Sequence, residues 1–509
     1  MTAKQTVTDV LIVGAGPTGL LLAGDLATAG IRVTVLEKRD TESNLTRAFA
    51  VHARSLELLD ARGLADDLIA TGRPLSSLRL FDRLRVDLAA LPSRFPFVLI
   101  TPQYHTERLL QERALKAGAT LLRGAEVVGL RQDAEGVTVE TRPRARSGEA
   151  PADGTTETHR AAYVVGTDGV HSTVRDLLGI PFPGESVVNS VVLADVRLDR
   201  APDELLTVGA GEGGFAFLAP FGDGWYRVIA WDRAEQHADG APPSLERIAE
   251  MTRTALGEDY GLHDARWSST FHSDERQVPN YRSGRVFLAG DAAHCHSPAG
   301  GQGMNTGLQD AANLSWKLVA AVRGHATDAL LDTYQTERHP VGKSVLRTSG
   351  ALIRLALAQS APTRVLRGAL TTLADHLDVV AERGARTVSG IGIRYAAPKD
   401  AHPLAGRRVP DLRLTALEEA REDGPAAPER LYEALRAGTF VLVSNDQLPA
   451  AEPWAGRLQT VAPADPHGKL RDTVLLVRPD GYAAWAAVDP GQGEVRAALA
   501  QWLGAPDQS

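Results

Sequence analysis

The sequence predicts a multidomain α/β protein, and three observations carry this prediction. The chain opens with a strand, a glycine-rich turn, a helix and a second strand (VTDVLIVGAGPTGLLLAGDLATAGIRVTVLEKR, residues 7–39), which is how a parallel βαβ unit starts. Residues 187–231 instead contain alternating runs such as VVLADVRL and GWYRVIAW, which are typical of an antiparallel sheet. A length of 509 residues exceeds what one hydrophobic core supports, so two or three domains are expected.

Helical spacing and chain-breaking residues place the elements of the first part. A helix over Leu20–Ala29 ends at Gly30, and a buried strand follows it. The other expected elements are helices His52–Ala61 and Thr106–Ala117, strands Ile31–Leu36, Glu126–Leu130, Val137–Thr141 and Tyr163–Val165, and a solvated loop over Pro143–His159.

The second part returns to a buried strand, Arg285–Ala289, which ends in Gly290 and Asp291. Helical spacing follows from Gly303 to Val322 and continues to about Arg383. From about Leu404 the tail has a different character and reads as a small α/β domain, with strands Thr439–Val443 and Thr473–Val477. We expect a discontinuous Rossmann-like domain that consists of residues 1–186 and 280–340. An antiparallel-sheet substrate domain, residues 187–279, is inserted in it, and residues 75–105 contribute to this second domain. A helical segment, 341–403, and the C-terminal domain, 404–509, follow.

The bulk composition excludes several classes of protein. A net charge of −8 argues against nucleic acid as the main partner, because phosphate binding needs a basic surface. Cys295 is the only cysteine, so an intrachain disulfide, a four-cysteine zinc site and a CxxC redox pair are excluded, which fits a reducing cytoplasm. The polar start and the absence of a long apolar run predict neither a signal peptide nor a membrane span. We expect a cytoplasmic monomer or homodimer.

The opening turn, Gly14-Ala15-Gly16-Pro17-Thr18-Gly19, matches GxGxxG between a strand and a helix. The first glycine permits a tight turn, the second lets a pyrophosphate approach the backbone, and the third lets helix and strand pack closely. The helix N-terminus adds free N–H groups and partial positive charge. Glu37 ends the second strand, where a carboxylate binds ribose hydroxyls and repels a 2′-phosphate. The motif therefore predicts FAD or NAD rather than NADP, and a glycine turn without a ligand is the disfavoured alternative.

A second GxGxxG, GAGEGG at residues 209–214, is not expected to bind a nucleotide. The sequence that follows, FAFLAPFGDGWYRV, is strand-like and offers no helix N-terminus to a phosphate. The stretch is predicted to be a glycine turn between antiparallel strands.

Two further segments separate FAD from NAD. GTDGVHSTVR (166–175) follows a short strand, and GRVFLAGDAAHCHSPAGGQGMNTGLQD (284–310) contains another. Asp291 sits at that strand's carboxyl end, where open α/β sheets bind ligands. Gly300, Gly301 and Gly303 provide adaptable backbone before a helix whose N-terminus can face an anionic ring edge. Either segment alone could be a helix cap and a turn-rich loop.

Together the three segments resemble the class A flavoprotein monooxygenases, the aromatic hydroxylases with the para-hydroxybenzoate hydroxylase fold, over Asp9 to Arg338. The resemblance implies FAD, with the ADP half at the opening turn, the ribityl or pyrophosphate region at Asp291, and the isoalloxazine at the loop before Met304. The DG pair, Asp168 and Gly169, is implied in both FAD and NAD(P)H binding. The implied cofactor set is Gly14, Gly16, Pro17, Thr18, Gly19, Glu37, Lys38, Arg47, Gln103, Val127, Asp168, Gly169, Asp291, Pro298, Gly301, Gly303, Met304 and Asn305.

Within this family the chain is most similar to actinomycete enzymes that act on aromatic polyketides or ansamycins. Those enzymes carry a C-terminal thioredoxin-like domain, and LLVRPDGYAAWAAV (475–488) resembles its final hairpin. Because the redox cysteines are absent, the domain is expected to have a structural or oligomeric role only.

The resemblance implies NADPH or NADH as cosubstrate, O2, and oxygen transfer through a flavin C4a-hydroperoxide to a bulky phenolic natural product. No catalytic side chain is assigned. Loop donors from Pro298 to Gly303 are expected to stabilise negative charge on reduced flavin. His294-Cys295-His296 is a poor metal set, and polar residues beside the flavin loop are the favoured interpretation. Four aromatic residues either line the substrate site or belong to plain core: Phe215, Phe217, Trp225 and Tyr226.

Other functions stay open beside the hydroxylase. The same chemistry could inactivate an antibiotic of the rifamycin or tetracycline class, or perform a Baeyer–Villiger or ring-opening oxidation. A flavin halogenase is disfavoured, because Trp225 and Trp231 do not fit its WxWxIP segment. A related saturating reductase would yield no oxygenated product, and a non-catalytic flavin-binding protein would show no substrate-stimulated NAD(P)H oxidation.

Overall fold

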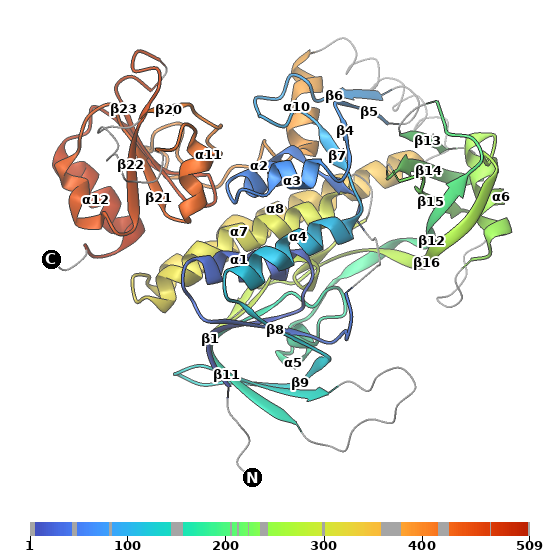
Figure 1. Cartoon of the computed structure of the whole chain (residues 1–509), viewed down its shortest axis with the longest axis horizontal. Helices are drawn as coiled ribbons and strands as arrows, with labels where there is room; N and C mark the ends of the chain where they lie inside the picture. Colours follow the sequence, from blue (N-terminus) through green and yellow to red (C-terminus); the bar gives the residue numbers. More distant parts are fainter. Residues whose placement is uncertain are drawn as a thin grey trace.

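A computed structural model describes residues 6–42, 48–80, 84–143, 156–203, 206–210, 213–221, 223–234, 243–297, 301–357, 378–415, 427–468 and 470–506. Figure 1 shows a parallel sheet crossed by long helices, an antiparallel sheet at one end of these helices, and a separate C-terminal domain near the other end. None of the described helices is both long and apolar enough to cross a lipid bilayer.

The parallel sheet has the strand order β17-β18-β11-β1-β2-β8. Strands β18, β11, β1, β2 and β8 pair in parallel, so their carboxyl ends lie along one edge of the sheet. That edge is where open α/β sheets bind ligands. The strands are β1 (Thr6–Val13), β2 (Val33–Glu37), β8 (Thr120–Arg123), β11 (Glu157–Gly166), β17 (Arg282–Ser283) and β18 (Val286–Leu288).

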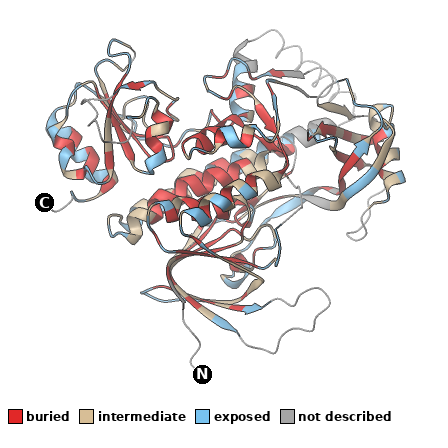
Figure 2. Ribbon diagram, in the orientation of Figure 1, coloured by how far each residue is buried: buried red, intermediate tan, exposed pale blue. Residues whose placement is uncertain are grey.

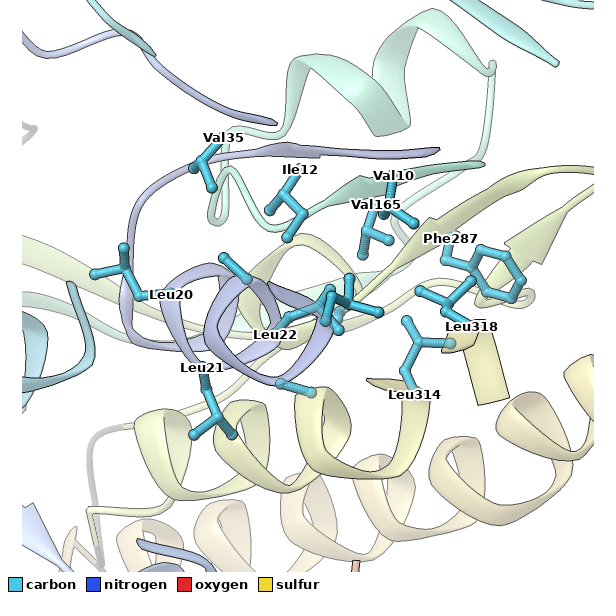
Figure 3. Close-up of a cluster of buried hydrophobic side chains, with 14 of the residues drawn as sticks. Val10, Ile12, Leu20, Leu21, Leu22, Val35, Val165, Phe287, Leu314 and Leu318 are labelled. Carbon is cyan, nitrogen blue, oxygen red and sulfur yellow. The ribbon is translucent and has the colours of Figure 1, made fainter. Parts of the chain in front are cut away.

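Three helices pack with this sheet, and Figure 3 shows leucines of two of them, α1 and α7, beside the strands. Leu20 and Leu22 of α1 and Leu314 and Leu318 of α7 are at most 2% exposed and face valine, isoleucine and phenylalanine side chains of the strands. Replacing one such leucine with alanine costs about 2–5 kcal/mol, so this layer is rigid. The helices are α1 (Pro17–Thr28), α4 (Gln103–Lys116) and α7 (Gln302–Val322).

The antiparallel sheet has the order β13-β14-β15-β12-β16-β19. One of its faces packs on α6 (Leu245–Leu256) and the other packs on residues that include Phe49, Leu75 and Val98. The last strand, β19, directly follows the Asp291 turn, so the sheet is hydrogen-bonded to the parallel-sheet domain. The strands are β12 (Gly184–Leu198), β13 (Thr207–Ala210), β14 (Gly214–Pro220), β15 (Tyr226–Asp232), β16 (Leu262–Gln277) and β19 (His294–Cys295).

The C-terminal domain has the strand order β20-β22-β21-β23-β24. Figure 2 shows that this domain has its own buried interior. Its thioredoxin-like character stays a prediction. Strands β9 (Ala125–Gln132) and β10 (Val137–Pro143) extend the first sheet from β11 by antiparallel pairing, and the 30-residue helix α8 (Asp328–Leu357) packs on α7. The smaller elements are α2 (Ala53–Asp60), α3 (Ala65–Ile69), α5 (Thr173–Leu177), β3 (Ala50–Val51), β4 (Arg73–Leu75), β5 (Ser77–Leu80), β6 (Leu84–Asp87), β7 (Val98–Ile100) and α10 (Asp378–Val388). The domain contains β20 (Leu414–Thr415), α11 (Leu431–Ala434), β21 (Phe440–Val443), β22 (Leu458–Pro463), β23 (Thr473–Val477), β24 (Ala483–Val488) and α12 (Gln492–Leu503).

Within the described residues the expected helices and strands are present, with one correction at the predicted loop Pro143–His159. Residues 144–155 of that loop and 358–377 of the expected helical stretch lie outside the described residues. Strand β10 runs to Pro143 and β11 already begins at Glu157, so both ends of the predicted loop are strand. The polar residues there misled the prediction, because they occupy exposed positions of paired strands such as Glu157, which pairs with Thr141. Gly209 and Ala210 of the GAGEGG stretch end β13 and Gly214 begins β14, and the two strands pair antiparallel as predicted, while residues 211–212 lie outside the described residues.

A buried ionic junction joins the C-terminal domain to α7 and α8. Lys317 of α7 donates to Glu337 of α8 at 2.8 Å, and Arg478 of the C-terminal domain donates to the same carboxylate at 2.6 Å. Lys317 is 0% exposed, and burial lowers its pKa from the ordinary value of 10.5 to about 8 despite the nearby Glu337.

We expect this shift to make the junction sensitive to alkaline pH. The folded state releases the Lys317 proton at a lower pH than the unfolded state, so the stability of the wild type relative to Lys317→Met should rise between about pH 8 and 10.5, by at most about 3 kcal/mol. Urea denaturation of both proteins at pH 7.5, 9 and 10 measures the difference. A difference in unfolding free energy that is flat or falls with pH would contradict this expectation.

Candidate functional site

The first two glycine motifs touch at the end of β1. Gly14 has φ +105°, and a Cβ built on it would lie 2.5 Å from the carbonyl oxygen of Thr167, which follows β11. The Thr167 hydroxyl donates to the carbonyl oxygens of Val13 and Gly14 at 2.9 Å each. A Cβ on Gly19 would lie 2.1 Å from the Gly14 carbonyl oxygen. Only glycine therefore allows the β1 and β11 turns to close on the start of α1.

The third motif reaches the same point through Thr18. A Cβ on Gly290, or on Gly307 of α7, would lie 2.7 or 2.3 Å from the Thr18 hydroxyl. The turn Gly290–Ala292 therefore sits beside the N-terminus of α1, and the Asp291 side chain on it is exposed. The structure thus brings the three sequence motifs together at one edge of the parallel sheet.

The residues of the opening turn fit the ADP half of FAD. Gly16 is the N-cap of α1 with φ −80° and ψ 177°, and no described atom lies within 4 Å of a Cβ built on it, so the space outside the turn is open. Glu37 is buried and accepts from the Ala15 N–H at 2.8 Å and from Arg39 Nε at 3.0 Å. Burial opposes ionisation of Glu37, but Arg39 and the Ala15 N–H lower its pKa overall. An ionised carboxylate at this place is able to accept hydrogen bonds from ribose hydroxyls.

The loop before α7 fits the ring end of the flavin. Gly301 is the N-cap of this 21-residue helix with φ +61°, which favours glycine. A Cβ on Gly303 would lie 3.9 Å from Asp291 Oδ1 and 3.6 Å from His296 Cε1. The first turn of α7 therefore lies next to the Asp291 turn, and its free N–H groups suit an anionic partner.

Asn305 and Gln103, both expected at the flavin, are engaged with the backbone around Ala50. Asn305 donates to the carbonyl oxygens of Ala50 and Gly301 at 2.9 and 2.7 Å and accepts from the His52 N–H at 2.9 Å. Gln103 accepts from the Ala48 N–H at 2.8 Å and donates to Glu107 at 2.7 Å. Both side chains therefore fix the conformation of the backbone from Ala48 to His52.

The remaining expected cofactor residues fall into different surroundings. Asp168 accepts from the Ser172 hydroxyl at 2.6 Å and from the Val174 N–H at 3.1 Å, and burial raises its pKa. Gly169 beside it has φ +83°. Pro17 is the first residue of α1, Val127 is in the core, Lys38 is exposed and Met304 packs against the core. Arg47 and Pro298 lie outside the described residues.

The four expected substrate aromatics lie on two faces of the antiparallel sheet. Phe217 approaches Phe49 with ring centroids 5.1 Å apart, and Phe215 stacks on Trp231 at 6.1 Å. Trp225 belongs to the same cluster. Tyr226 packs instead with the residues under α6. The structure therefore groups three of the four and separates Tyr226 from them.

Sequence reasoning missed a buried charge pair on the face that carries Phe217. Arg227 donates to Asp195 at 2.7 Å, and both residues are at most 1% exposed. The Arg227 guanidinium lies 5.3 Å from the ring centres of Phe221 and Trp267. Among the described residues, no acceptor is hydrogen-bonded to Arg227 Nη1. The available signal was a charged residue at an inward position of the alternating run WYRVIAW.

A second missed group lies under the Asp291 turn. Asp310 of α7 accepts from the Gly290 N–H at 3.1 Å, from His294 Nε2 at 2.6 Å and from Arg338 Nε at 2.7 Å. Burial opposes ionisation, but Arg338 and His294 lower the pKa of Asp310 overall. His294 is thus bound to a carboxylate, and no group of three His, Cys, Asp or Glu residues within the described ranges could hold a metal ion.

Comparison with known proteins agrees with this site. The "FAD binding domain" family model matches residues 7–349, and "Aromatic-ring hydroxylase, C-terminal" matches residues 402–506. The chain belongs to the FAD-dependent aromatic-ring hydroxylases, the class A flavoprotein monooxygenases, and it is an enzyme with FAD as its cofactor.

Several relatives are similar over nearly the full length. The chain is 38% identical over 502 residues to rifampicin monooxygenase from Streptomyces venezuelae, covering 98% of this chain and 99% of the relative. It is 40% identical over 526 residues to 12-dehydrotetracycline 5-monooxygenase/anhydrotetracycline 6-monooxygenase from Streptomyces rimosus, with the same coverage. The solved anhydrotetracycline hydroxylase OxyS from Streptomyces rimosus superposes with a TM-score of 0.85 at 38% identity, covering 98% of this chain and 100% of that one.

The open space at Gly16 yields a sharp prediction. Gly16→Ala should leave the stability of the flavin-free protein within about 1 kcal/mol, because its backbone angles suit alanine. FAD affinity should fall at least tenfold, because the methyl group would occupy the path of the pyrophosphate. Fluorescence titration with FAD measures the affinity.

Gly491→Ala is the matched control. Gly491 is also a helix N-cap with an extended backbone (φ −71°, ψ 157°), and no described atom lies within 4 Å of a Cβ built on it, but it belongs to the C-terminal domain. Equal FAD affinity in the two variants would rule out a phosphate at Gly16.

Proposed function

We propose that the protein consumes NADPH or NADH and O2 to hydroxylate a bulky phenolic, polyketide-like compound. The observation that carries the proposal is that the aromatic sheet face lies next to the start of α7. Phe217 packs on Phe49, and a Cβ built on Gly301 would lie 3.0 Å from the Cβ of the neighbouring Ala50. When bound, reduced FAD activates oxygen and transfers one oxygen atom to the substrate. The relatives named for tetracycline intermediates support the substrate class.

We assign the ADP half of FAD to the opening turn. Gly14, Gly16 and Gly19 let the backbone approach the pyrophosphate, and the α1 N-terminus attracts its charge. Glu37 would accept from the ribose hydroxyls. Asp291 would hold the ribityl or pyrophosphate region, since its turn adjoins both α1 and α7. Pro17, Thr18, Lys38, Val127, Asp168 and Gly169 complete the proposed set at this end.

The ring end would lie at the first turn of α7. Gly301, Gly303 and Met304 would border the ring, and the N–H groups of the helix start would stabilise negative charge on the reduced ring. Asn305 and Gln103 contribute by fixing the backbone at Ala48 and Ala50. Arg47 and Pro298 stay in the proposal from the family resemblance.

The substrate would lie between this loop and the antiparallel sheet. Phe215, Phe217 and Trp225 offer flat apolar surface that suits a polycyclic aromatic compound and excludes water. Arg227 pairs with Asp195 and the nearby Arg266 pairs with Asp223, so the four charges balance overall. Arg227 Nη1 nevertheless has no acceptor among the described residues and is the local positive pole of this face. Positive charge favours the phenolate or enolate form of a substrate, which is the more electron-rich form. No side chain is assigned as a general base.

Two related functions compete with biosynthetic hydroxylation. The relative named rifampicin monooxygenase favours inactivation of an antibiotic as the second candidate. A Baeyer–Villiger or ring-opening outcome would use the same site. The product separates these possibilities, since hydroxylation adds one oxygen with the ring system intact.

The deciding experiment uses the purified protein. We expect a yellow protein whose NADPH consumption is stimulated by a member of a panel that includes anhydrotetracycline, rifampicin and polyhydroxylated anthraquinones, with a product heavier by one oxygen atom. Tight FAD binding without stimulation by any phenolic compound would favour a non-catalytic flavoprotein and contradict the proposal.

The buried pair Asp195–Arg227 gives a mutational test. Removing both charges in Asp195→Leu/Arg227→Met avoids an unpaired buried charge, so folding should be retained. Affinity for anhydrotetracycline, which carries acidic enols, should fall severalfold, because the buried guanidinium would attract an anionic oxygen of the substrate across the aromatic face without touching it. Tyr226→Phe, on the opposite face, should bind as the wild type does. Unchanged affinity in the double variant would remove Arg227 from the substrate site.

A further inference from the structure

Several contacts join the C-terminal domain to the rest of the chain, among them ion pairs of Arg430 and Arg436 with Asp60. The most deeply buried of the charged contacts is made by the tip of its last hairpin, residues 478–482, between β23 and β24. Arg54 of α2 donates to the carbonyl oxygen of Asp480, and Asn313 of α7 donates to the Asp480 carboxylate at 3.3 Å. Arg478 donates to Glu337 of α8 at 2.6 and 3.1 Å. The hairpin tip is therefore fixed to three helices at once.

This contact is buried and highly charged. Arg54, Arg478 and Asp480 are at most 2% exposed. Apolar residues in such a place are often as stabilising as ion pairs, because desolvation offsets the attraction between the charges. Ion pairs and hydrogen bonds are, however, directional, so the contact specifies one orientation of the tip.

A first connection leads from the tip to the loop before α7. Arg54 lies in the first turn of α2, and its N–H donates to the carbonyl oxygen of Ser389 at 3.1 Å. His52, just before α2, has its Nδ1 2.6 Å from the carbonyl oxygen of Val388 and donates its N–H to Asn305. Asn305 in turn binds the Gly301 carbonyl oxygen. Hydrogen bonds therefore lead from His52, two residues before Arg54, through Asn305 to the backbone of Gly301 at the proposed ring end.

A second connection leads from the tip to the Asp291 turn. The Tyr482 ring packs on the Tyr395 ring with centroids 4.3 Å apart. The Tyr395 hydroxyl accepts from Arg338 Nη1 at 3.3 Å, and Arg338 Nε donates to Asp310. Asp310 binds the Gly290 N–H, which belongs to the residue just before Asp291. The two connections therefore end at the two segments assigned to the flavin.

We propose that the C-terminal domain supports FAD binding. The tip of its hairpin holds Gly301, at the start of α7, and the Asp291 turn in the conformation that binds FAD. The proposal rests on the assignment of those two segments under the proposed function. Tyr482, Tyr395 and Arg54 are positioning residues, because they act on FAD through other residues. The domain then has a function in the absence of any redox cysteine.

The test measures FAD affinity in full-length, flavin-free protein without substrate. Tyr482→Leu keeps an apolar side chain but loses the ring contact with Tyr395, and FAD affinity should fall at least tenfold. Tyr395→Phe loses only the hydroxyl that accepts from Arg338, and affinity should fall about threefold. Hydrogen–deuterium exchange of the flavin-free proteins should be faster at residues 286–297 in both variants.

Two matched variants separate positioning from general loss of stability. Tyr482→Phe keeps the ring and removes only a hydroxyl that has no hydrogen-bond partner among the described residues, so this variant should bind FAD with wild-type affinity. Leu499→Ala removes a buried side chain of α12 in the same domain and should lower the melting temperature while FAD affinity stays within twofold.

Wild-type affinity in both Tyr482→Leu and Tyr395→Phe, or an equal loss of affinity in Leu499→Ala, would overturn the proposal. Because no substrate is present, such a result leaves the proposed hydroxylation standing. A wild-type protein that binds no FAD would overturn both.

Discussion

The site depends on the close approach of three turns around the first turn of α1. The turns after β1, β11 and β18 meet there because glycine stands where their backbones or Thr18 would collide with a side chain, at Gly14, Gly19, Gly290 and Gly307. Parallel pairing puts the ends of these strands at one edge, but it does not by itself bring them into contact. The absence of side chains at these glycines allows that contact. The open space left at Gly16 is where a phosphate can approach.

The sequence predicted the parts of this arrangement that are coded locally. A strand, a glycine motif, a helix and an acid at Glu37 lie within one short stretch, and the alternating runs near Trp225 identify the antiparallel sheet from period alone. Contacts between distant segments were beyond such reasoning. Arg227 at an inward position of its strand indicates a buried charge, but the identity of its partner Asp195, and the pairing of His294 with Asp310, need the tertiary structure.

The two kinds of buried interior have different roles. Between the parallel sheet and its helices, leucine and valine side chains form a hydrophobic layer, and this provides stability. At the junction with the C-terminal domain, buried Arg54, Arg478 and Asp480 stand beside apolar contacts such as Trp316 with Phe440. Desolvation offsets much of the energy of such pairs, but their geometry admits a single docked arrangement. We infer that the apolar layer provides most of the folding stability, whereas the ionic contacts fix the orientation of the C-terminal domain relative to the rest of the chain.

Helix α7 connects these layers, because its two faces differ. Leu308, Leu314 and Leu318 lie in the apolar core with α1 and the parallel sheet. Thr306, Asp310, Asn313 and Lys317 follow at spacings of four, three and four residues, which places them on one helical face. Asp310, Asn313 and Lys317 bind Arg338, the Gly290 N–H and Glu337 through their side chains, Thr306 accepts from Arg338 through its carbonyl oxygen, and all four are at most 2% exposed. Under the proposed assignment of the flavin to the start of α7, a displacement of the C-terminal domain would therefore displace the segments that hold the flavin. The physical requirement for this coupling is that the polar face be fully paired, since one unpaired group would let the helix and the domain separate.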